Sequence, residues 1–335
     1  GGDTGEASSS SQVPTDNCEM LMYAKDGVYL QQIPRKVGMW VMTAGGRVEG
    51  LVRCNKPGTY YLAAADGPTY NKDSDDPQVI YNIHLQDVVA TLEVAAREPT
   101  QPPVNQQEEQ EQPSLEQCTP LRPSYAADLR DAAITAANAQ DSIIYQNTTF
   151  NFSPAQGWGC TVNGQNFTYP DPDPIVMPLG SVVEWQNFHA LNFHPVHIHS
   201  TDMMIQELPV EWLANGTEYT DFYRVGDFHD TLLLPMQTGG PIGYAKMRMQ
   251  PGPFAGYGVL HCHFLSHEDA GCMKVVQFQC PGYGGEEGGG EAVQPDECEF
   301  EYSVKGTFPP SSGTSPSGSK VIMLMMIVVI VLLVG

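Results

Sequence analysis

Two short histidine-rich stretches decide how this chain folds: HPVHIH at residues 194–199 and HCHFLSHEDAGCM at residues 261–273. Both stand among short runs rich in Val, Ile, Leu, Tyr and Phe that are separated by Gly and Pro, which predicts β-strands. Side chains of a strand point alternately to its two faces. The alternation therefore sorts the histidines and the cysteine of these stretches into two groups, one on each face of a sheet.

The first predicted group is called the cysteine group and consists of His194, Cys262 and His267. The second is called the four-histidine group and consists of His197, His199, His261 and His263. Two imidazoles and a thiolate are the ligand set of a blue-copper electron-transfer site. Zinc also accepts cysteine and histidine, but a zinc site leaves the four-histidine group unexplained. Because Cys262 is bonded directly to two histidines, an electron on its sulfur has a short covalent route to metals on the other face.

The two stretches resemble the copper-binding motifs of multicopper oxidases with three cupredoxin domains. HPVHIH matches the family pattern HPxHxH, and the second stretch matches HCHxxxHxxxGx in a form similar to bilirubin oxidase, spore-coat laccases and bacterial copper-efflux oxidases. The resemblance covers residues 118–280 as the family's third domain. It extends more loosely to residues 18–98, where GGRVEGLVRCNKPGTYYL is similar to the later part of the second domain.

The resemblance implies an all-β fold of cupredoxin-like (plastocyanin-like) Greek-key sandwiches, one complete and one partial. It makes the cysteine group the ligands of a type 1 copper, His197 a ligand of a type 2 copper and the other members of the four-histidine group ligands of a type 3 pair. A phenol, a bilin or a metal ion would give single electrons to the type 1 copper, and the trinuclear cluster would reduce O2 to water. The resemblance also implies that Glu268 delivers protons to the oxygen that is reduced at the cluster. The alternative is that Glu268 is a solvated surface residue.

Two features depart from the family pattern. The family takes four more cluster histidines from two HxH motifs in its first domain, whereas the remaining histidines here, His84, His189 and His229, are isolated. Half of the cluster ligands are therefore present, and we expect a missing N-terminal cupredoxin domain to supply the rest. The second departure is Cys272, a candidate axial ligand of the type 1 copper, where the family has Met, Leu or Phe.

Three states of Cys272 are compatible with the sequence. Its sulfur binds copper, or it packs near the metal as a neutral thiol, or it forms a disulfide with Cys280 or a more distant cysteine. A bridge to Cys280 is disfavoured, because the intervening MKVVQFQ is predicted to be an extended strand that holds the two ends too far apart for a disulfide. With Cys262 set aside, seven cysteines remain, so at least one has no partner within the chain.

Two other functions stay open at this point. A copper nitrite reductase is a two-domain relative with the His-Cys pair, but its motif lacks the second flanking histidine that His263 supplies here. A non-catalytic, membrane-anchored copper protein for electron transfer is favoured by the missing HxH motifs. The intact four-histidine group argues against that second alternative.

The composition indicates an extracellular protein. Among 335 residues, 39 are acidic and 16 are basic, and the net charge of −23 argues against nucleic acid as a partner because phosphates would be repelled. The eight cysteines include no CxxC pair, which disfavours a zinc ribbon. Four N-x-[ST] sequons favour a secreted glycoprotein in an oxidising compartment; they begin at Asn147, Asn151, Asn166 and Asn215.

Changes in composition divide the chain into six segments. These are a flexible linker at 1–17, the partial domain at 18–98, a Pro/Gln/Glu-rich linker at 99–117, the copper-binding domain at 118–280, a stalk at 281–320 and an apolar tail at 321–335. As a helix the tail spans about 22 Å, which is short of the roughly 30 Å hydrocarbon core. Because small polar residues precede it, the tail is either a GPI-attachment signal or a transmembrane helix. Either would anchor the protein to the membrane at the cell surface.

Overall fold

The structure is a computed structural model that describes residues 17–38, 40–65, 85–96, 126–153, 159–190, 194–208, 222–234, 244–280 and 298–305. The predicted linker at 99–117, the apolar tail and all but the last residue of the first linker lie outside the described residues. The same is true of Cys118, His84 and Asn215. Within the described ranges, none of the helices combines the length and the apolar composition needed to cross a bilayer.

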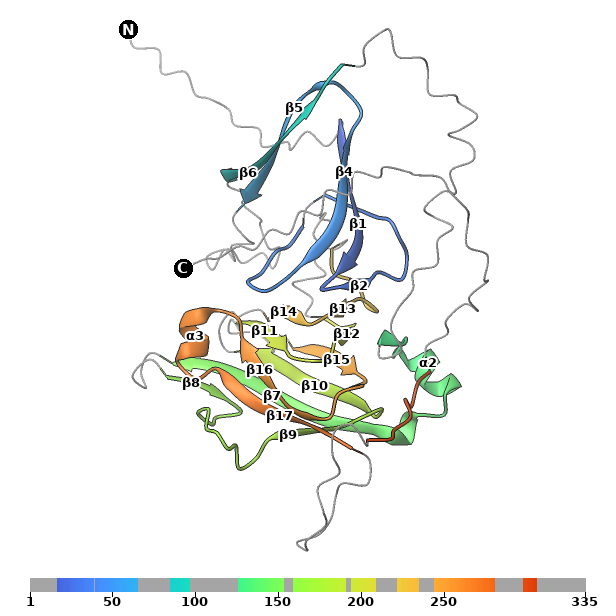
Figure 1. Cartoon of the computed structure of the whole chain (residues 1–335), viewed down its shortest axis with the longest axis vertical. Helices are drawn as coiled ribbons and strands as arrows, with labels where there is room; N and C mark the ends of the chain where they lie inside the picture. Colours follow the sequence, from blue (N-terminus) through green and yellow to red (C-terminus); the bar gives the residue numbers. More distant parts are fainter. Residues whose placement is uncertain are drawn as a thin grey trace, which may run out of the picture.

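The N-terminal part consists of two small antiparallel sheets (Figure 1). The first contains β1 (Cys18–Lys25), β2 (Val28–Tyr29), β3 (Arg35–Val37) and β4 (Val48–Cys54). The second contains β5 (Gly58–Ala65) and β6 (Leu85–Val94). Strand β1 pairs with each of the other three strands of its sheet. A disulfide joins Cys18 to Cys54, which face each other across β1 and β4 and fix the register of these strands.

The C-terminal domain is a sandwich of two sheets, with few helical residues (Figure 1). Its strands are β7 (Ile143–Ser153), β8 (Gly159–Val162), β9 (Ile175–Pro178), β10 (Val182–Ala190), β11 (His194–Ile198), β12 (Met203–Glu207), β13 (Phe228–His229), β14 (Thr231–Leu234), β15 (Ala245–Met249), β16 (Gly256–Cys262) and β17 (Met273–Gln279). Its helical segments are α2 (Asp131–Ala136), η3 (Gln140–Ser142) and α3 (Leu265–Asp269).

The order of the strands is that of a cupredoxin-like sandwich. One sheet runs β13-β12-β15-β10-β7-β8 and the other runs β14-β11-β16-β17-β9. Sequence neighbours β10 and β11 lie in different sheets, and the pairs β7–β10 and β9–β17 are parallel. Such crossings between two sheets are typical of Greek-key sandwiches. The predicted all-β, cupredoxin-like fold is confirmed.

The two sheets bury a common apolar core, and a bulge in β10 shapes its centre. Residues three apart on a regular strand point to opposite faces, yet Trp185 and Phe188 of β10 are both fully buried. The register with β15 shifts between these residues, so the extra residue turns both rings inward. They stack with their ring centroids 4.6 Å apart. Phe150 of β7 packs edge-on against Phe188 at 6.3 Å.

Part of the predicted stalk belongs to the sandwich. The disulfide between Cys280 and Cys298 brings the segment 298–305 back to the domain. The side-chain amide of Gln250 then donates to the carbonyl of Val304 at 2.9 Å and accepts from its amide at 2.8 Å. Val304 is 5% exposed. The prediction of a stalk is therefore wrong for residues 298–305, because the disulfide and the packed Val304 give this polar segment a fixed place.

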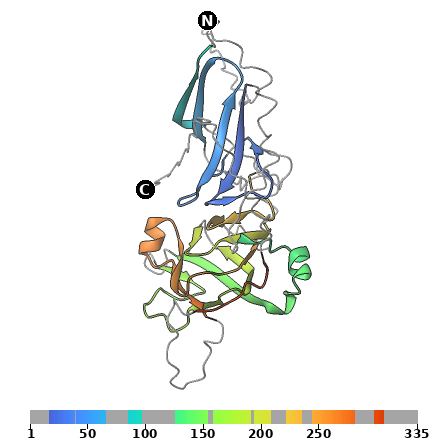
Figure 2. The same cartoon turned by 45° about the vertical axis from the view of Figure 1, so that its right-hand side comes forward.

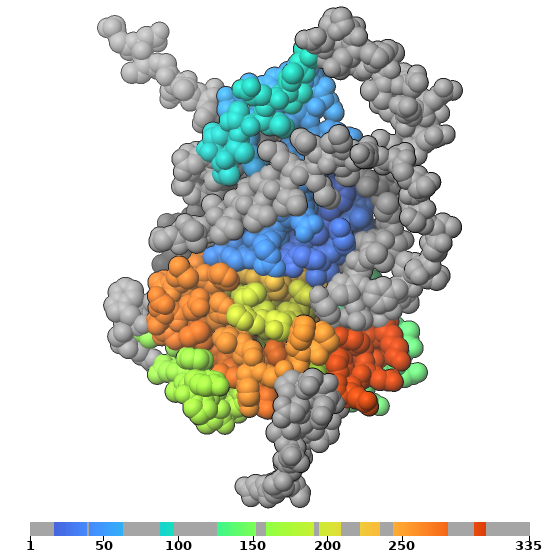
Figure 3. Space-filling view, in the orientation of Figure 1, coloured from blue at the N-terminus to red at the C-terminus, as the bar shows by residue number. Residues whose placement is uncertain are grey.

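The sheet of β1 to β4 lies against the side of the sandwich that carries β13 and β14 (Figure 1). The two parts are in contact (Figures 2 and 3). A buried ion pair crosses the join. Asp227 accepts from Lys25 Nζ at 2.6 Å and from both terminal nitrogens of Arg35 at 2.7 Å. All three residues are less than 10% exposed. A buried charge that loses its partner costs several kcal/mol, so these contacts fix how the two parts meet.

Candidate metal centre

The sheet register explains how two distant stretches form one centre. Strands β11 and β16 are antiparallel neighbours, with Val196 opposite Cys262 and His197 opposite His261. Opposite residues of neighbouring strands share a face, so Cys262 lies on the face of His194 and Val196. His261 and His197 lie on the other face. The alternation predicted from the sequence is therefore present in the structure.

The three side chains of the cysteine group lie together inside the domain. Nδ1 of His194 is 3.3 Å from Nδ1 of His267, and Sγ of Cys262 is 3.5 Å from the same Nδ1 of His267. His194 and Cys262 are fully buried. His194 comes from β11, Cys262 ends β16, and His267 lies in α3, the short helix that follows β16.

The spacing of these atoms fits a metal ion. Two ligand atoms about 2 Å from one ion at 120° to each other are about 3.5 Å apart. The distances of 3.3 Å and 3.5 Å agree with that value. Without an ion, the two Nδ1 atoms can form one hydrogen bond, in which one neutral imidazole is the donor and the other is the acceptor. The chemistry of this donor set, two imidazoles and a thiolate, favours copper in a trigonal site.

The four-histidine group forms a second centre on the opposite face. The ring centroids of its members are 5.0–5.6 Å apart in each of the five pairs that are in contact. Nε2 of His199 is 3.3 Å from Nε2 of His261. A cavity of about 450 Å³ adjoins the group, and His197, His199 and the carboxylates Asp26, Asp202 and Asp230 contribute to its lining.

The sequence of the domain matches a known family. Residues 137–279 match the family model described as multicopper oxidase. This part of the chain is a multicopper oxidase domain. No curated protein matches the chain in sequence.

Solved multicopper oxidases have a similar fold. A variant of the multicopper oxidase McoA from the hyperthermophile Aquifex aeolicus is 15% identical, with a TM-score of 0.50 and coverage of 78% of this chain and 50% of that one. A metallo-oxidase from Campylobacter jejuni is 17% identical, with a TM-score of 0.49 and coverage of 78% and 49%. A laccase-like multicopper oxidase from Ochrobactrum sp. is 20% identical, with a TM-score of 0.46 and coverage of 79% and 51%. The chain spans about half the length of these proteins.

Burial keeps the cysteine group of the multicopper oxidase domain uncharged when no metal is bound. Burial and the nearby His267 lower the pKa of His194 to about 3. Burial raises the pKa of the Cys262 thiol to about 12. A metal binds the thiolate and releases the thiol proton, so the domain offers a neutral pocket whose charge changes only on metal binding.

Glu268 lies beside the four-histidine group. Its Oε2 is 3.4 Å from Nδ1 of His261, and its side chain is 32% exposed. The same Nδ1 donates to the carbonyl of Cys262 at 3.0 Å. With Nδ1 protonated, His261 has the lone pair of Nε2 for a metal. Glu268 thus reaches both solvent and a histidine of the multicopper oxidase domain's second centre.

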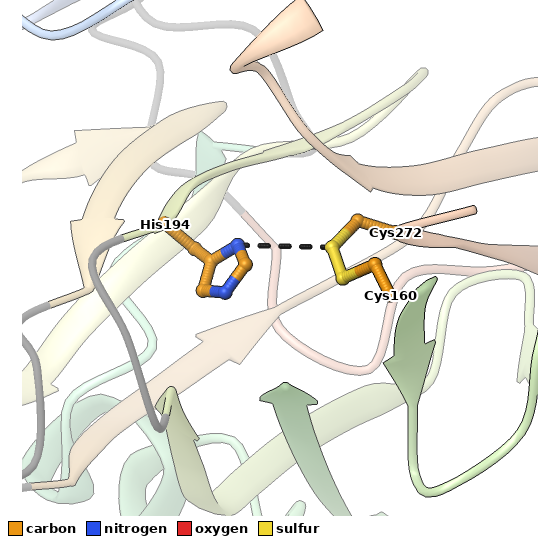
Figure 4. A group of neighbouring side chains, drawn as sticks. All are labelled: Cys160, His194 and Cys272. Carbon is orange, nitrogen blue, oxygen red and sulfur yellow. Dashed lines mark hydrogen bonds between the residues drawn. A yellow bond between two sulfur atoms is a disulfide. The ribbon is translucent and has the colours of Figure 1, made fainter. Parts of the chain in front are cut away.

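Cys272 is not a free thiol. It forms a disulfide with Cys160, and its Sγ is 3.9 Å from Nδ1 of His194 (Figure 4). The prediction that Cys272 binds copper as an axial thiolate is therefore wrong, since its sulfur is already bonded to sulfur. The bridge forms because β8 and the loop before β17 meet, with the amide of Cys160 donating to the carbonyl of Ala270 at 2.9 Å. Within the described residues, Cys262 is the free cysteine.

Several polar residues around the second centre were not singled out by the sequence motifs. Asp230 accepts from Nδ1 of His197 through its backbone carbonyl at 3.0 Å. Asp26 and Arg47 come from the N-terminal part and reach the same place. None belongs to a local pattern with the histidines. The pairing of β11 with β14 places Thr231 opposite His197 and so brings the preceding Asp230 within reach of that ring. His229 binds Asp26, and His189 contacts Thr149 at 3.2 Å.

Proposed function

We propose that the chain is the copper-binding C-terminal part of an oxidase that transfers electrons one at a time from a substrate to O2. The cysteine group would hold a type 1 copper. His197 would hold a type 2 copper, and the other members of the four-histidine group would hold part of a type 3 pair. One observation supports this most directly: Cys262 points to one group while its bonded neighbour His261 belongs to the other.

Bound copper would alternate between Cu(I) and Cu(II), accepting single electrons at one group and giving them to O2 at the other. The residues provide the path between the groups. The backbone of Cys262 joins its sulfur to both flanking histidines, and Nδ1 of His261 is hydrogen-bonded to the Cys262 carbonyl at 3.0 Å. Glu268 would hold a proton close to His261 and exchange it with solvent.

The proposal includes the missing N-terminal cupredoxin domain, the first of the family, as a partner. Clusters of this family use eight histidines, and the four-histidine group supplies four of them. The other four would come from a first domain on the open side of the group, where the 450 Å³ cavity lies. A phenol, a bilin or a metal ion would be the electron donor.

Copper loading of the purified chain tests this function. We expect one tightly bound copper with strong visible absorption, loss of that absorption in Cys262→Ser, and no O2 uptake by the chain alone with a phenolic or ferrous donor. Absence of the visible absorption in copper-loaded protein would overturn the type 1 assignment. Recovery of O2 uptake on adding a first cupredoxin domain supports the oxidase, and a coloured but inactive complex supports an electron-transfer protein.

We also propose that the protein is glycosylated and tethered to the extracellular face of a membrane. The sequons at Asn147 and Asn166 are on exposed residues, which supports their modification. The apolar tail at 321–335 would provide the anchor. Release from cells by a phosphatidylinositol-specific phospholipase would identify a GPI anchor, whereas retention would identify a spanning helix. Recovery of the protein in the cytosol would contradict both.

A further inference from the structure

A turn and a loop of the N-terminal part reach the four-histidine group together. The turn contains Asp26, between β1 and β2, and the loop contains Gly45 and Arg47, just before β4. The two segments hold each other: the Asp26 amide donates to the Arg47 carbonyl at 3.0 Å, and the Arg47 amide donates to Asp26 Oδ1 at 2.8 Å. They therefore approach the sandwich as one unit.

Arg47 binds the carboxylate of Asp230 through both terminal nitrogens of its guanidinium. Nη1 donates to Oδ1 at 3.2 Å, and Nη2 makes a short contact with Oδ2. The same nitrogens donate to the carbonyls of Gly45 at 2.9 Å and Asp26 at 3.1 Å. A planar guanidinium held at four acceptors has a fixed orientation. It can therefore fix the position of Asp230 as well.

Asp230 in turn fixes the ring of His197. Nδ1 of His197 is 3.0 Å from the Asp230 carbonyl oxygen and 3.0 Å from Thr231 Oγ1. The Thr231 hydroxyl donates to Oδ1 of Asp230 at 2.8 Å. Since that hydroxyl proton is used, Nδ1 of His197 is the donor in its own contacts. Nε2 is then the nitrogen with a free lone pair, on the side of the ring away from Asp230.

The same loop lies against a second member of the group. A Cβ atom on Gly45 would be 2.3 Å from Cδ2 and 2.7 Å from Nε2 of His263. Only a residue without a side chain allows this approach, and the φ of +78° also favours glycine. The backbone of the loop therefore covers the ring of His263, while Arg47 reaches His197 through Asp230.

We propose that Arg47 is a positioning residue for the four-histidine group: acting from the other part of the chain through Asp230, it selects the tautomer and orientation of His197 that bind a metal through Nε2. The inference rests on the proposed function, in which this group holds copper. Partners that orient a ligating histidine typically change metal affinity by 10- to 100-fold.

The test compares Arg47→Met with two controls on the full chain. Arg53→Met removes an exposed arginine of the same sheet that pairs with Glu19. Asp227→Asn weakens the join between the two parts at a different point. The first readout is the neutral tautomer of His197 in the metal-free protein, from nitrogen-15 NMR of the imidazoles. We expect protonated Nδ1 in the parent and both controls, and a mixture of tautomers in Arg47→Met.

The second readout is Cu(II) itself, titrated after the cysteine group is filled. Electron paramagnetic resonance separates the second, non-blue copper from the type 1 signal. We expect Arg47→Met to weaken the second copper by about 10-fold or more, with the type 1 signal unchanged. Arg47→Lys keeps the charge but loses the bidentate contact with Asp230, so we expect an intermediate loss of affinity for the second copper. This variant replaces Arg47→Met in the test if Arg47→Met does not fold.

The outcomes separate the inference from the proposed function. If the copper-loaded parent lacks the type 1 absorption, the proposed function fails. If the parent binds no second copper, half of the cluster ligands do not hold a metal by themselves. In both cases the tautomer of His197 still decides whether Arg47 positions it. If Arg47→Met retains the parent tautomer and the parent affinity, the inference is overturned. It is also overturned if Asp227→Asn changes the tautomer as much as Arg47→Met does, because the effect would then come from general loosening of the join.

Discussion

Sγ of Cys272 lies 3.9 Å from Nδ1 of His194, yet it is bonded to Sγ of Cys160 (Figure 4). A sulfur therefore lies next to the cysteine group without being a thiolate. Both cysteines are fully buried, together with Cys262. The disulfide thus separates two sulfur chemistries in one cluster: a bridged pair that supports the fold and a single thiol available for a metal.

Loss of this disulfide should destabilise the domain. Cys160 and Cys272 are 112 residues apart, and closing a loop of that length in the unfolded chain is worth about 2–5 kcal/mol. We expect the double variant Cys160→Ser/Cys272→Ser to lose about that much unfolding free energy in a urea titration. If the double variant is as stable as the parent, the bridge does not form in solution.

The single variant Cys160→Ser should change the metal site instead. It leaves a free thiol at Cys272 near His194, and a thiolate on copper stabilises Cu(II). We expect the copper-loaded single variant to show an altered visible spectrum and a lower reduction potential than the double variant. Identical spectra for the two variants would mean that the freed thiol does not reach the copper.

The buried ion pair at the join should be a large contributor to stability. Asp227→Asn leaves the charges of Lys25 and Arg35 buried without a carboxylate, which costs about 3–5 kcal/mol. Glu301→Gln is the matched control, because the pair of Glu301 with Lys305 is exposed and worth less than about 1 kcal/mol. Chemical denaturation of both variants measures the difference. Equal losses would contradict a structural role for the pair.

Asp202 should make the metal-free protein less stable as the pH rises. Burial, together with Asp230 and Asp26, raises the pKa of Asp202 to about 7, while Arg47 and His197 oppose this shift. The unfolded chain has a pKa of about 4 for this group. A raised folded pKa favours folding below pH 4, and that contribution is lost as the pH rises through 7.

The variant Asp202→Asn removes this titration. We expect its unfolding free energy to exceed that of the parent by a difference that grows from pH 4 to pH 8 and reaches about 2–4 kcal/mol. Asp173→Asn, on an exposed residue, is the control. Parallel pH profiles for the parent and Asp202→Asn would show that the pKa of Asp202 is the same in the folded and the unfolded protein.

Two glycines with nearly the same φ test the packing of residues 298–305. Gly180 has a φ of +76°, and a Cβ there would be 2.1 Å from the carbonyl oxygen of Glu301. Gly164 has a φ of +74° with nothing within 4 Å. Alanine at Gly164 should cost only the backbone strain of about 1–2 kcal/mol. Alanine at Gly180 should cost more, because it also displaces the packed segment.

Proteolysis provides the second measurement for this pair. If residues 298–305 pack as described, Gly180→Ala should expose them to cleavage and Gly164→Ala should not. Equal stability and equal cleavage of the two variants would indicate that the segment is not held against the domain in solution.

The sequence by itself determined how the histidines and the cysteine are divided between the two groups. Strand alternation places Cys262 and His261 on opposite faces whatever the rest of the chain does, since the period of two is a property of the extended backbone. For the same reason the strand-rich composition indicated an all-β domain. Short-range patterns of this kind need no knowledge of which strands are neighbours.

Only the tertiary structure decided which distant residues complete those centres. The partner of Cys272 is 112 residues away, and Asp230 meets His197 only because β14 pairs with β11. Arg47 reaches Asp230 across a join between two parts of the chain. Such contacts depend on the order of strands and on buried charge pairs, which leave no periodic signal in the sequence. The physical reason is that local geometry sets the direction of a side chain, whereas its neighbours are set by how the whole chain packs.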